Sequence, residues 1–129
     1  YENQTCAGLQ LYQWMRGERP IIRSDGTFLR DYLYVRDAVT GYLQLAEALD
    51  RPDVRGQAFN CCTDAPMSVL DMTRLIVSLS PHPDLEPVIL DEARHEIRDQ
   101  YLDGTKIRQA VGWAPHYTRE AALRETIAW

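Results

Sequence analysis

The sequence predicts a helix-rich α+β fold with three or four short strands. Apolar residues recur at helical spacing in several segments, short β-branched and aromatic runs lie between these segments, and Gly, Pro, Asp and Ser separate them. The chain has 129 residues, which is enough for one buried core but too few for a cofactor domain and a substrate domain together. We therefore expect residues 1–129 to form a single domain.

The first half of the chain is predicted to alternate between helix and strand. Helical periodicity predicts a helix from Gln4 to Arg16, and the apolar residues Pro20–Ile22 predict a short strand before a tight Asp-Gly turn at 24–27. Phe28–Val35 has the alternating pattern of a strand, and from Val35 to Leu49 the spacing of apolar residues changes to that of a helix.

The second half begins with a predicted buried strand at Gln57–Cys62. Ser68 is expected to cap the next helix, which ends before Pro81. The remaining predicted elements are a short strand, a charged irregular loop, a short helix closed by a glycine, and a last helix capped by a threonine, at Pro87–Leu90, Ala93–Tyr101, Asp103–Gly112 and from Thr118 onwards.

Composition argues against several classes of partner and site. The net charge is -5, so binding to nucleic acid or to anionic membranes through overall basicity is not expected. The three cysteines, Cys6, Cys61 and Cys62, are an odd number without C-x-x-C spacing, which argues against a zinc site and a disulfide framework. No apolar run approaches the roughly 18 residues of a membrane span, and no leader opens the sequence. We therefore expect a cytoplasmic protein without a membrane partner.

The sequence lacks the motifs of a free-standing enzyme. It has no G-x-G-x-x-G loop or P-loop, and no tyrosine has a lysine at the spacing that lowers a catalytic tyrosine pKa. The His95-Glu96 pair lacks the second histidine of an H-E-x-x-H zinc helix. We expect no catalytic residue, no cofactor-binding residue and no metal site in this chain.

The stretch from Arg23 to Asp37 holds the strongest candidate for a binding residue. Arg30 follows the Asp-Gly turn and has aromatic residues close in sequence. A guanidinium can bind a phosphate through paired hydrogen bonds, which matters in a protein whose net charge would repel an anion. An arginine next to an aspartate is also often part of an ion pair, so these residues alone leave a structural role open.

Several motifs, in a fixed order, resemble the C-terminal half of a known enzyme family. They are R-D-Y-L-Y-V-x-D, an amphipathic helix ending in L-A-E-A-L, G-x-A-F-N, an S-V-L helix, H-E-I-x-x-Q-Y-L-D-x-x-K and G-W-x-P. Together they resemble the substrate-binding part of the NAD(P)-dependent sugar-nucleotide epimerases and dehydratases, the extended short-chain dehydrogenases. The loop I-R-S-D-G-T and the run H-E-I-x-x-Q-Y-L-D are most similar to the CDP-glucose 4,6-dehydratase branch.

The resemblance implies a set of substrate contacts. Arg30 matches the arginine that holds the diphosphate of the nucleotide sugar, and Arg23 occupies a place near the nucleobase. Arg94 is the candidate for a second phosphate-binding arginine, with Arg98 as the alternative, and Gln100 lies near a position that lines the sugar pocket.

Three further matching positions are expected to be structural. They are Asp31 and Asp37, which would brace a loop and a helix start, and Asn60, at the end of the predicted strand.

The resemblance also implies that this chain is a C-terminal fragment whose catalytic residues lie in an absent N-terminal Rossmann domain. The parent would be an NAD-dependent homo-oligomer that converts CDP-glucose to CDP-4-keto-6-deoxyglucose, by hydride transfer from the sugar to NAD, elimination of water and return of the hydride. The alternatives are a sugar-nucleotide 4-epimerase of the same family and a non-catalytic nucleotide-sugar-binding domain. The fragment alone is expected to be inactive and to bind no cofactor.

Overall fold

The computed structural model describes residue 14 and residues 16–129. The predicted helix at Gln4–Arg16 therefore lies almost wholly outside the described residues. Trp14 is helical and buried, and its carbonyl accepts a hydrogen bond from Gly17 at 3.0 Å.

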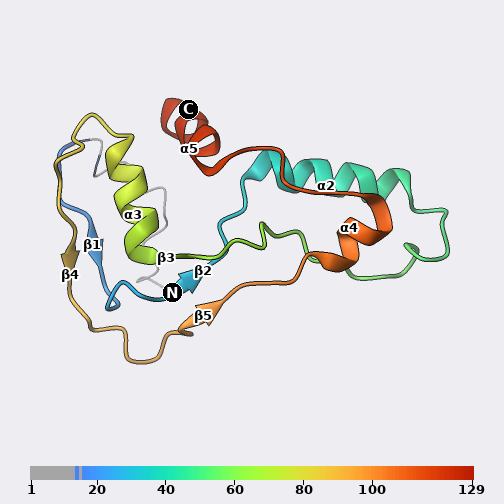
Figure 1. Cartoon of the computed structure of the whole chain (residues 1–129), viewed down its shortest axis with the longest axis horizontal. Helices are drawn as coiled ribbons and strands as arrows, with labels where there is room; N and C mark the ends of the chain where they lie inside the picture. Colours follow the sequence, from blue (N-terminus) through green and yellow to red (C-terminus); the bar gives the residue numbers. More distant parts are fainter. Residues whose placement is uncertain (1–13, 15) are drawn as a thin grey trace.

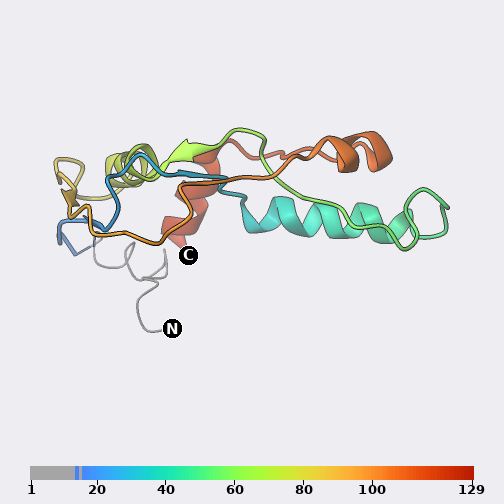
Figure 2. The same cartoon turned by 90° about the horizontal axis from the view of Figure 1, so that it is seen from below.

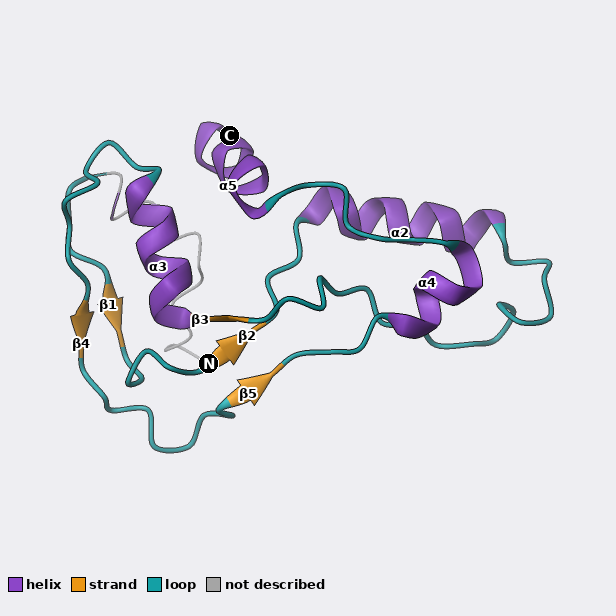
Figure 3. Cartoon of the chain, viewed as in Figure 1, coloured by secondary structure: helices purple, strands orange, loops and turns teal. Residues whose placement is uncertain are grey.

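The described part is an elongated assembly of helices and very short strands (Figures 1 and 3). The helices are α2 (Val35–Glu47), α3 (Val69–Ser78), α4 (Thr105–Val111) and α5 (Arg119–Ala128). The strands are β1 (Ile21–Ile22), β2 (Leu29–Arg30), β3 (Met67–Ser68), β4 (Val88–Ile89) and β5 (Asp99–Gln100). Helix α3 and the β1–β4 pair lie at one end of the molecule, and α2 and α4 lie at the other.

The strands form two small sheets. Strand β1 pairs with β4 in parallel, with Ile21 opposite Val88. Strand β2 is the middle of a three-stranded sheet, antiparallel to β3 and parallel to β5. The second sheet brings residues near position 30 next to residues near position 100, although the sequence separates them widely.

The strands at Pro20–Ile22 and Pro87–Leu90 and the turn at 24–27 are confirmed. The turn depends on Gly26, whose φ of +85° lies in the left-handed region that glycine adopts without strain. The helix from Val35 is also confirmed. Ser68 accepts a hydrogen bond from the Asp71 amide at 3.0 Å and caps α3 as predicted.

The strand predicted at Phe28–Val35 is much shorter than its pattern indicated. Only Leu29 and Arg30 pair, because the chain then leaves the sheet and the Asp31 carboxylate accepts the Thr63 amide at 3.0 Å. Ala93–Tyr101 was predicted to be a loop, but β5 lies inside this segment and pairs with β2.

The buried strand predicted at Gln57–Cys62 is wrong for the described structure. The segment is extended, but it has no paired strand in the described part of the chain, and only Cys62 in it is buried. Side chains hold it from one side instead: Lys106 Nζ donates to the Ala58 carbonyl at 2.9 Å and lies 4.8 Å from the centre of the Phe59 ring.

The core at the α2 end is built around Trp113, which is fully buried. Its indole N–H donates to the Asp37 carbonyl and to Thr40 Oγ1, both at 3.1 Å. Asp37 is 1% exposed, and its carboxylate accepts the backbone N–H of His116 at 2.8 Å. Asp37 therefore joins the start of α2 to the segment before α5, which confirms its predicted bracing role.

Candidate functional site

Arg30 lies in the middle strand of the three-stranded sheet, and its side chain is largely covered. Its Nη1 donates to the carbonyls of Leu29 at 2.7 Å and Arg98 at 3.0 Å, which fixes the guanidinium against the sheet. Its Nη2 lies 3.9 Å from Glu96 Oε2, which is too long for a hydrogen bond. The carbon at the centre of the guanidinium lies 5.7 Å from the Phe28 ring centre. The ion pair is thus loose, and the side chain keeps 22% of its surface exposed.

Gln100 is brought directly beside Arg30. The two residues are partners across the parallel β2–β5 pair, and Gln100 is exposed. Burial raises the pKa of Tyr32, and the positive charge of Arg30 opposes this rise. The structure therefore places Gln100 next to Arg30.

The loop 91–98 contains Arg94, begins next to Arg23 and leads to β5, which pairs with the strand of Arg30. The Arg23 carbonyl accepts the amides of Glu92 at 2.7 Å and Ala93 at 3.2 Å, so the loop is attached where β1 ends. Both arginines have exposed side chains. No contact among the described residues joins the Arg94 side chain to Arg30, so the structure places these arginines along one loop without converging them on one point.

Among the described residues, Arg98 shares contacts with Arg30 that Arg94 lacks. Its Nη2 donates to Thr27 Oγ1 at 3.1 Å, and its guanidinium carbon lies 5.9 Å from the Phe28 ring centre. Two guanidiniums therefore approach the same phenyl ring. The sequence offered Arg98 as the alternative to Arg94, and its contacts favour it as the second cation of the site.

The arrangement is suited to holding an anion at the surface. Arg30 and Arg98 supply positive charge beside the turn at 24–27, and the contacts of Arg30 to backbone carbonyls preorganise its side chain. A rigid guanidinium loses little freedom when a phosphate binds. Chemical transformation is not supported by this cluster, since it contains no paired nucleophile and base.

The turn at 24–27 lowers the pKa of one of its own side chains, the carboxyl group of Asp25. Asp25 accepts hydrogen bonds from the Thr27 amide at 2.8 Å and from the Thr27 hydroxyl at 2.7 Å. These bonds, together with the charge of Arg98, hold the pKa of Asp25 below its ordinary value of 3.8.

We expect Thr27→Val to raise the pKa of Asp25 toward 3.8, because the hydroxyl donor is lost while the amide donor remains. A lowered pKa stabilises the fold above 3.8, and this stabilisation is lost as the pH falls through the folded-state pKa. A carboxyl ¹³C NMR titration of both proteins measures the change. Equal pKa values in the two proteins would contradict the assigned cause.

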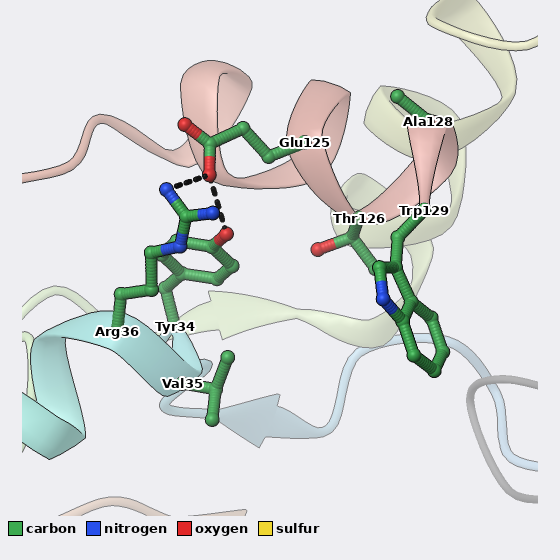
Figure 4. A pocket seen from close by; sticks show the side chains of 7 residues that line it. All are labelled: Tyr34, Val35, Arg36, Glu125, Thr126, Ala128 and Trp129. Carbon is green, nitrogen blue, oxygen red and sulfur yellow. Dashed lines mark hydrogen bonds and ion pairs between the residues drawn. The ribbon is translucent and has the colours of Figure 1, made fainter.

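A cavity of about 570 Å³ lies elsewhere, between the start of α2 and the end of α5. Figure 4 shows Tyr34, Arg36 and Glu125 on one side of it and Trp129 on the other. Glu125 accepts from the Tyr34 hydroxyl at 2.6 Å and pairs with Arg36 at 3.0 Å. No sequence pattern indicated this groove, because its two walls come from segments far apart in the chain. The groove does not include Arg30 or the other predicted site residues.

The described residues do not fit NAD. A dinucleotide needs a glycine turn that is open to its phosphates, whereas the buried glycines here face the chain's own side chains. A Cβ at Gly41 would lie 2.9 Å from Cys61 Sγ, and one at Gly104 would lie 2.9 Å from Cys62 Sγ. Within the described part, no group of three or more His, Cys, Asp or Glu side chains is placed to hold a metal ion. None of the described helices is long and apolar enough to cross a bilayer.

Comparison with known proteins shows what this chain is similar to. The model of the NAD dependent epimerase/dehydratase family matches residues 9–62. The UDP-glucose 4-epimerase of Mycolicibacterium smegmatis is 31% identical over 114 residues, which cover 88% of this chain and 34% of that protein. The dTDP-glucose 4,6-dehydratase of Haemophilus influenzae is 30% identical over 121 residues, covering 84% and 34%. The chain is thus similar, over part of their length, to NAD-dependent epimerases and dehydratases of nucleotide sugars.

Solved structures of such epimerases and dehydratases share the fold. The UDP-glucose 4-epimerase of Thermotoga maritima, solved with UDP-glucose, is 29% identical and superposes with a TM-score of 0.77 over 93% of this chain and 37% of its own. The dTDP-glucose 4,6-dehydratase of Bacillus anthracis, solved with NAD, superposes with a TM-score of 0.73. The chain thus spans about a third of the length of the curated epimerases and dehydratases that it matches.

Proposed function

We propose that this chain is the nucleotide-sugar-binding part of an NAD-dependent sugar-nucleotide 4,6-dehydratase that acts on CDP-glucose. The observation that carries the proposal is the position of Arg30: its guanidinium is fixed by two backbone carbonyls, partly exposed, and in register with Gln100. Similarity to epimerases and dehydratases of nucleotide sugars supports the substrate class. The catalytic residues and the NAD site would lie in an N-terminal half that precedes this sequence in the whole protein.

The role of this part is binding and orientation. Arg30, with Arg98 or Arg94 as a second cation, would hold the diphosphate, and Gln100 would donate to or accept from a sugar hydroxyl. Arg23 would stack on or hydrogen-bond to the base. Binding energy from these remote groups would position the sugar for chemistry in the other half.

The choice of CDP-glucose rests on the loop at 22–27, whose sequence I-R-S-D-G-T resembles the CDP-glucose 4,6-dehydratase branch. The second candidate is a UDP-sugar 4-epimerase. It is supported by the 31% identity to the M. smegmatis epimerase and by the similarity to the T. maritima structure. Both candidates use the same anion site and differ in the half that would carry the reaction.

The test is turnover by the full-length protein that contains this chain. With NAD and CDP-glucose we expect a 4-keto-6-deoxy product, detected by its ultraviolet absorbance in alkali and by mass loss of one water. Parallel reactions with UDP-glucose and dTDP-glucose measure the preference for the base. Clean formation of a galactose nucleotide would establish the epimerase instead. Absence of turnover and of binding with all these nucleotides would rule out the proposal.

A further inference from the structure

The buried ring of Phe28 has two cations beside it. Phe28 is 8% exposed and directly precedes β2. The central guanidinium carbons of Arg30 and Arg98 lie 5.7 Å and 5.9 Å from its ring centre. Both distances are within the roughly 6 Å over which the negative face of an aromatic ring attracts a cation. The same ring therefore offsets part of the positive charge of both arginines.

The backbone on either side of this ring is fixed. The Phe28 carbonyl accepts the amide of Val69, the first residue of α3, at 3.0 Å, and the next amide, that of Leu29, donates to the Arg98 carbonyl at 3.0 Å. Figures 1 and 2 show β2 and β5 in the middle of the elongated molecule, between the end with α3 and the end with α2 and α4. A ring anchored in this way is a rigid support for side chains that lie against it.

The ring matters most for Arg98. The Arg98 side chain has one hydrogen bond to a described residue, from Nη2 to Thr27 Oγ1 at 3.1 Å, and it forms no ion pair with any described residue. Arg30, by contrast, donates from Nη1 to two carbonyls. A free arginine side chain loses much rotamer freedom when it binds a ligand. A ring that already restrains Arg98 lowers this cost.

Two guanidiniums beside one ring match an anion with two phosphate groups. One guanidinium can bind one phosphate through paired hydrogen bonds, and a second guanidinium held nearby can bind the next. Like charges repel each other, and the ring face offsets part of this repulsion before the anion arrives. A monophosphate would engage one cation and leave the other without a partner. The arrangement therefore favours a diphosphate.

We propose that Phe28 is a positioning residue, which holds the guanidiniums of Arg30 and Arg98 together as one site and so sets the preference for a diphosphate over a monophosphate. The inference rests on the proposed function, because it takes the diphosphate of a nucleotide sugar as the ligand. A ring that only filled the core would affect stability and leave this preference unchanged.

Calorimetry of the full-length protein with CDP and with CMP tests this role. We expect the unaltered protein to bind CDP at least about tenfold more tightly than CMP. Phe28→Leu keeps an apolar side chain but removes the ring, so the ratio of the two affinities should fall about threefold to tenfold, the range for losing one or two cation–ring contacts. Phe28→Tyr keeps the ring face and should preserve the ratio.

Phe59→Leu is the matched control. The Phe59 ring centre lies 4.8 Å from the Nζ of Lys106, which belongs to α4, so the same substitution removes a cation–ring contact there as well. It should leave the ratio of CDP to CMP affinity unchanged. A thermal melt of each variant shows that it is folded. If Phe28→Leu does not fold, Phe28→Met takes its place in the comparison.

Three results would overturn the role of Phe28. They are an unaltered protein that binds CDP no more tightly than CMP, an unchanged ratio in a folded Phe28→Leu protein, and a Phe28→Tyr protein whose ratio falls as far as that of Phe28→Leu. Turnover of a nucleotide sugar together with any of these results rejects the inference alone. Binding of CDP that depends on the Phe28 ring, without turnover of any nucleotide sugar, rejects the proposed enzymatic activity alone.

Discussion

Arg30→Ala is expected to weaken binding of the nucleotide sugar by about 1.5–3 kcal/mol, the range for a hydrogen bond to a charged group. This corresponds to a loss of affinity of roughly tenfold to more than a hundredfold. The physical reason is that Arg30 is preorganised, because its Nη1 is fixed by the carbonyls of Leu29 and Arg98. Within residues 16–129, no carboxylate lies within hydrogen-bond distance of its Nη2. Isothermal calorimetry with the full-length protein and CDP-glucose measures the change.

Two variants separate binding from folding. Arg30 also holds the Arg98 carbonyl, so Arg30→Ala is expected to cost some stability, and a thermal melt must accompany the calorimetry. Arg30→Lys keeps the charge but loses the paired donors, and an intermediate loss of affinity is expected. Arg55→Ala is the control, because Arg55 is 73% exposed and lies beyond α2. Unchanged affinity in a folded Arg30→Ala protein would remove Arg30 from the site.

Local patterns predicted the helices better than the strands. Periodicity and capping residues such as Ser68 and Thr118 act within one or two turns of the chain, and the structure confirms them. Strand length depends on a partner that periodicity does not identify. Phe28–Val35 therefore became a two-residue strand, and Asp99–Gln100 became a strand inside a charged run that had no strand pattern.

The candidate site was predictable in its residue types but not in its geometry. Arg30 stood out because its neighbours formed a turn and an aromatic run, whereas the contact of Arg30 with Gln100 depends on a parallel pairing across the chain. The roles of Arg94 and Arg98 differ through single contacts, such as that of Arg98 with Thr27. Contacts of this kind are set by the path of loop 91–98, which carries no periodic signal.

Trp113→Ala is expected to produce the largest loss of stability in this chain, about 3–5 kcal/mol. The side chain is 0% exposed and fills the space between α2 and the segment before α5, so its removal leaves a cavity. The carbonyl of Asp37 and the hydroxyl of Thr40 also lose one hydrogen bond each, although the Asp37 carbonyl still accepts from the Thr40 hydroxyl at 2.7 Å. Because small domains are stable by only about 5–15 kcal/mol, much of the protein is expected to unfold under mild denaturant.

Urea unfolding of the chain, followed by far-ultraviolet circular dichroism, measures the loss without relying on tryptophan fluorescence. Trp113→Phe restores most of the volume but not the N–H, so its expected cost is smaller, about 0.5–1.5 kcal/mol for each lost hydrogen bond, because the Thr40 hydroxyl still donates to the Asp37 carbonyl. Trp129→Ala is the matched control, because Trp129 is fully exposed and the same truncation there should cost little. If the alanine variants at 113 and 129 lose equal stability, Trp113 does not anchor α2, and the packing that holds Asp37 and the inner face of the helix is wrong.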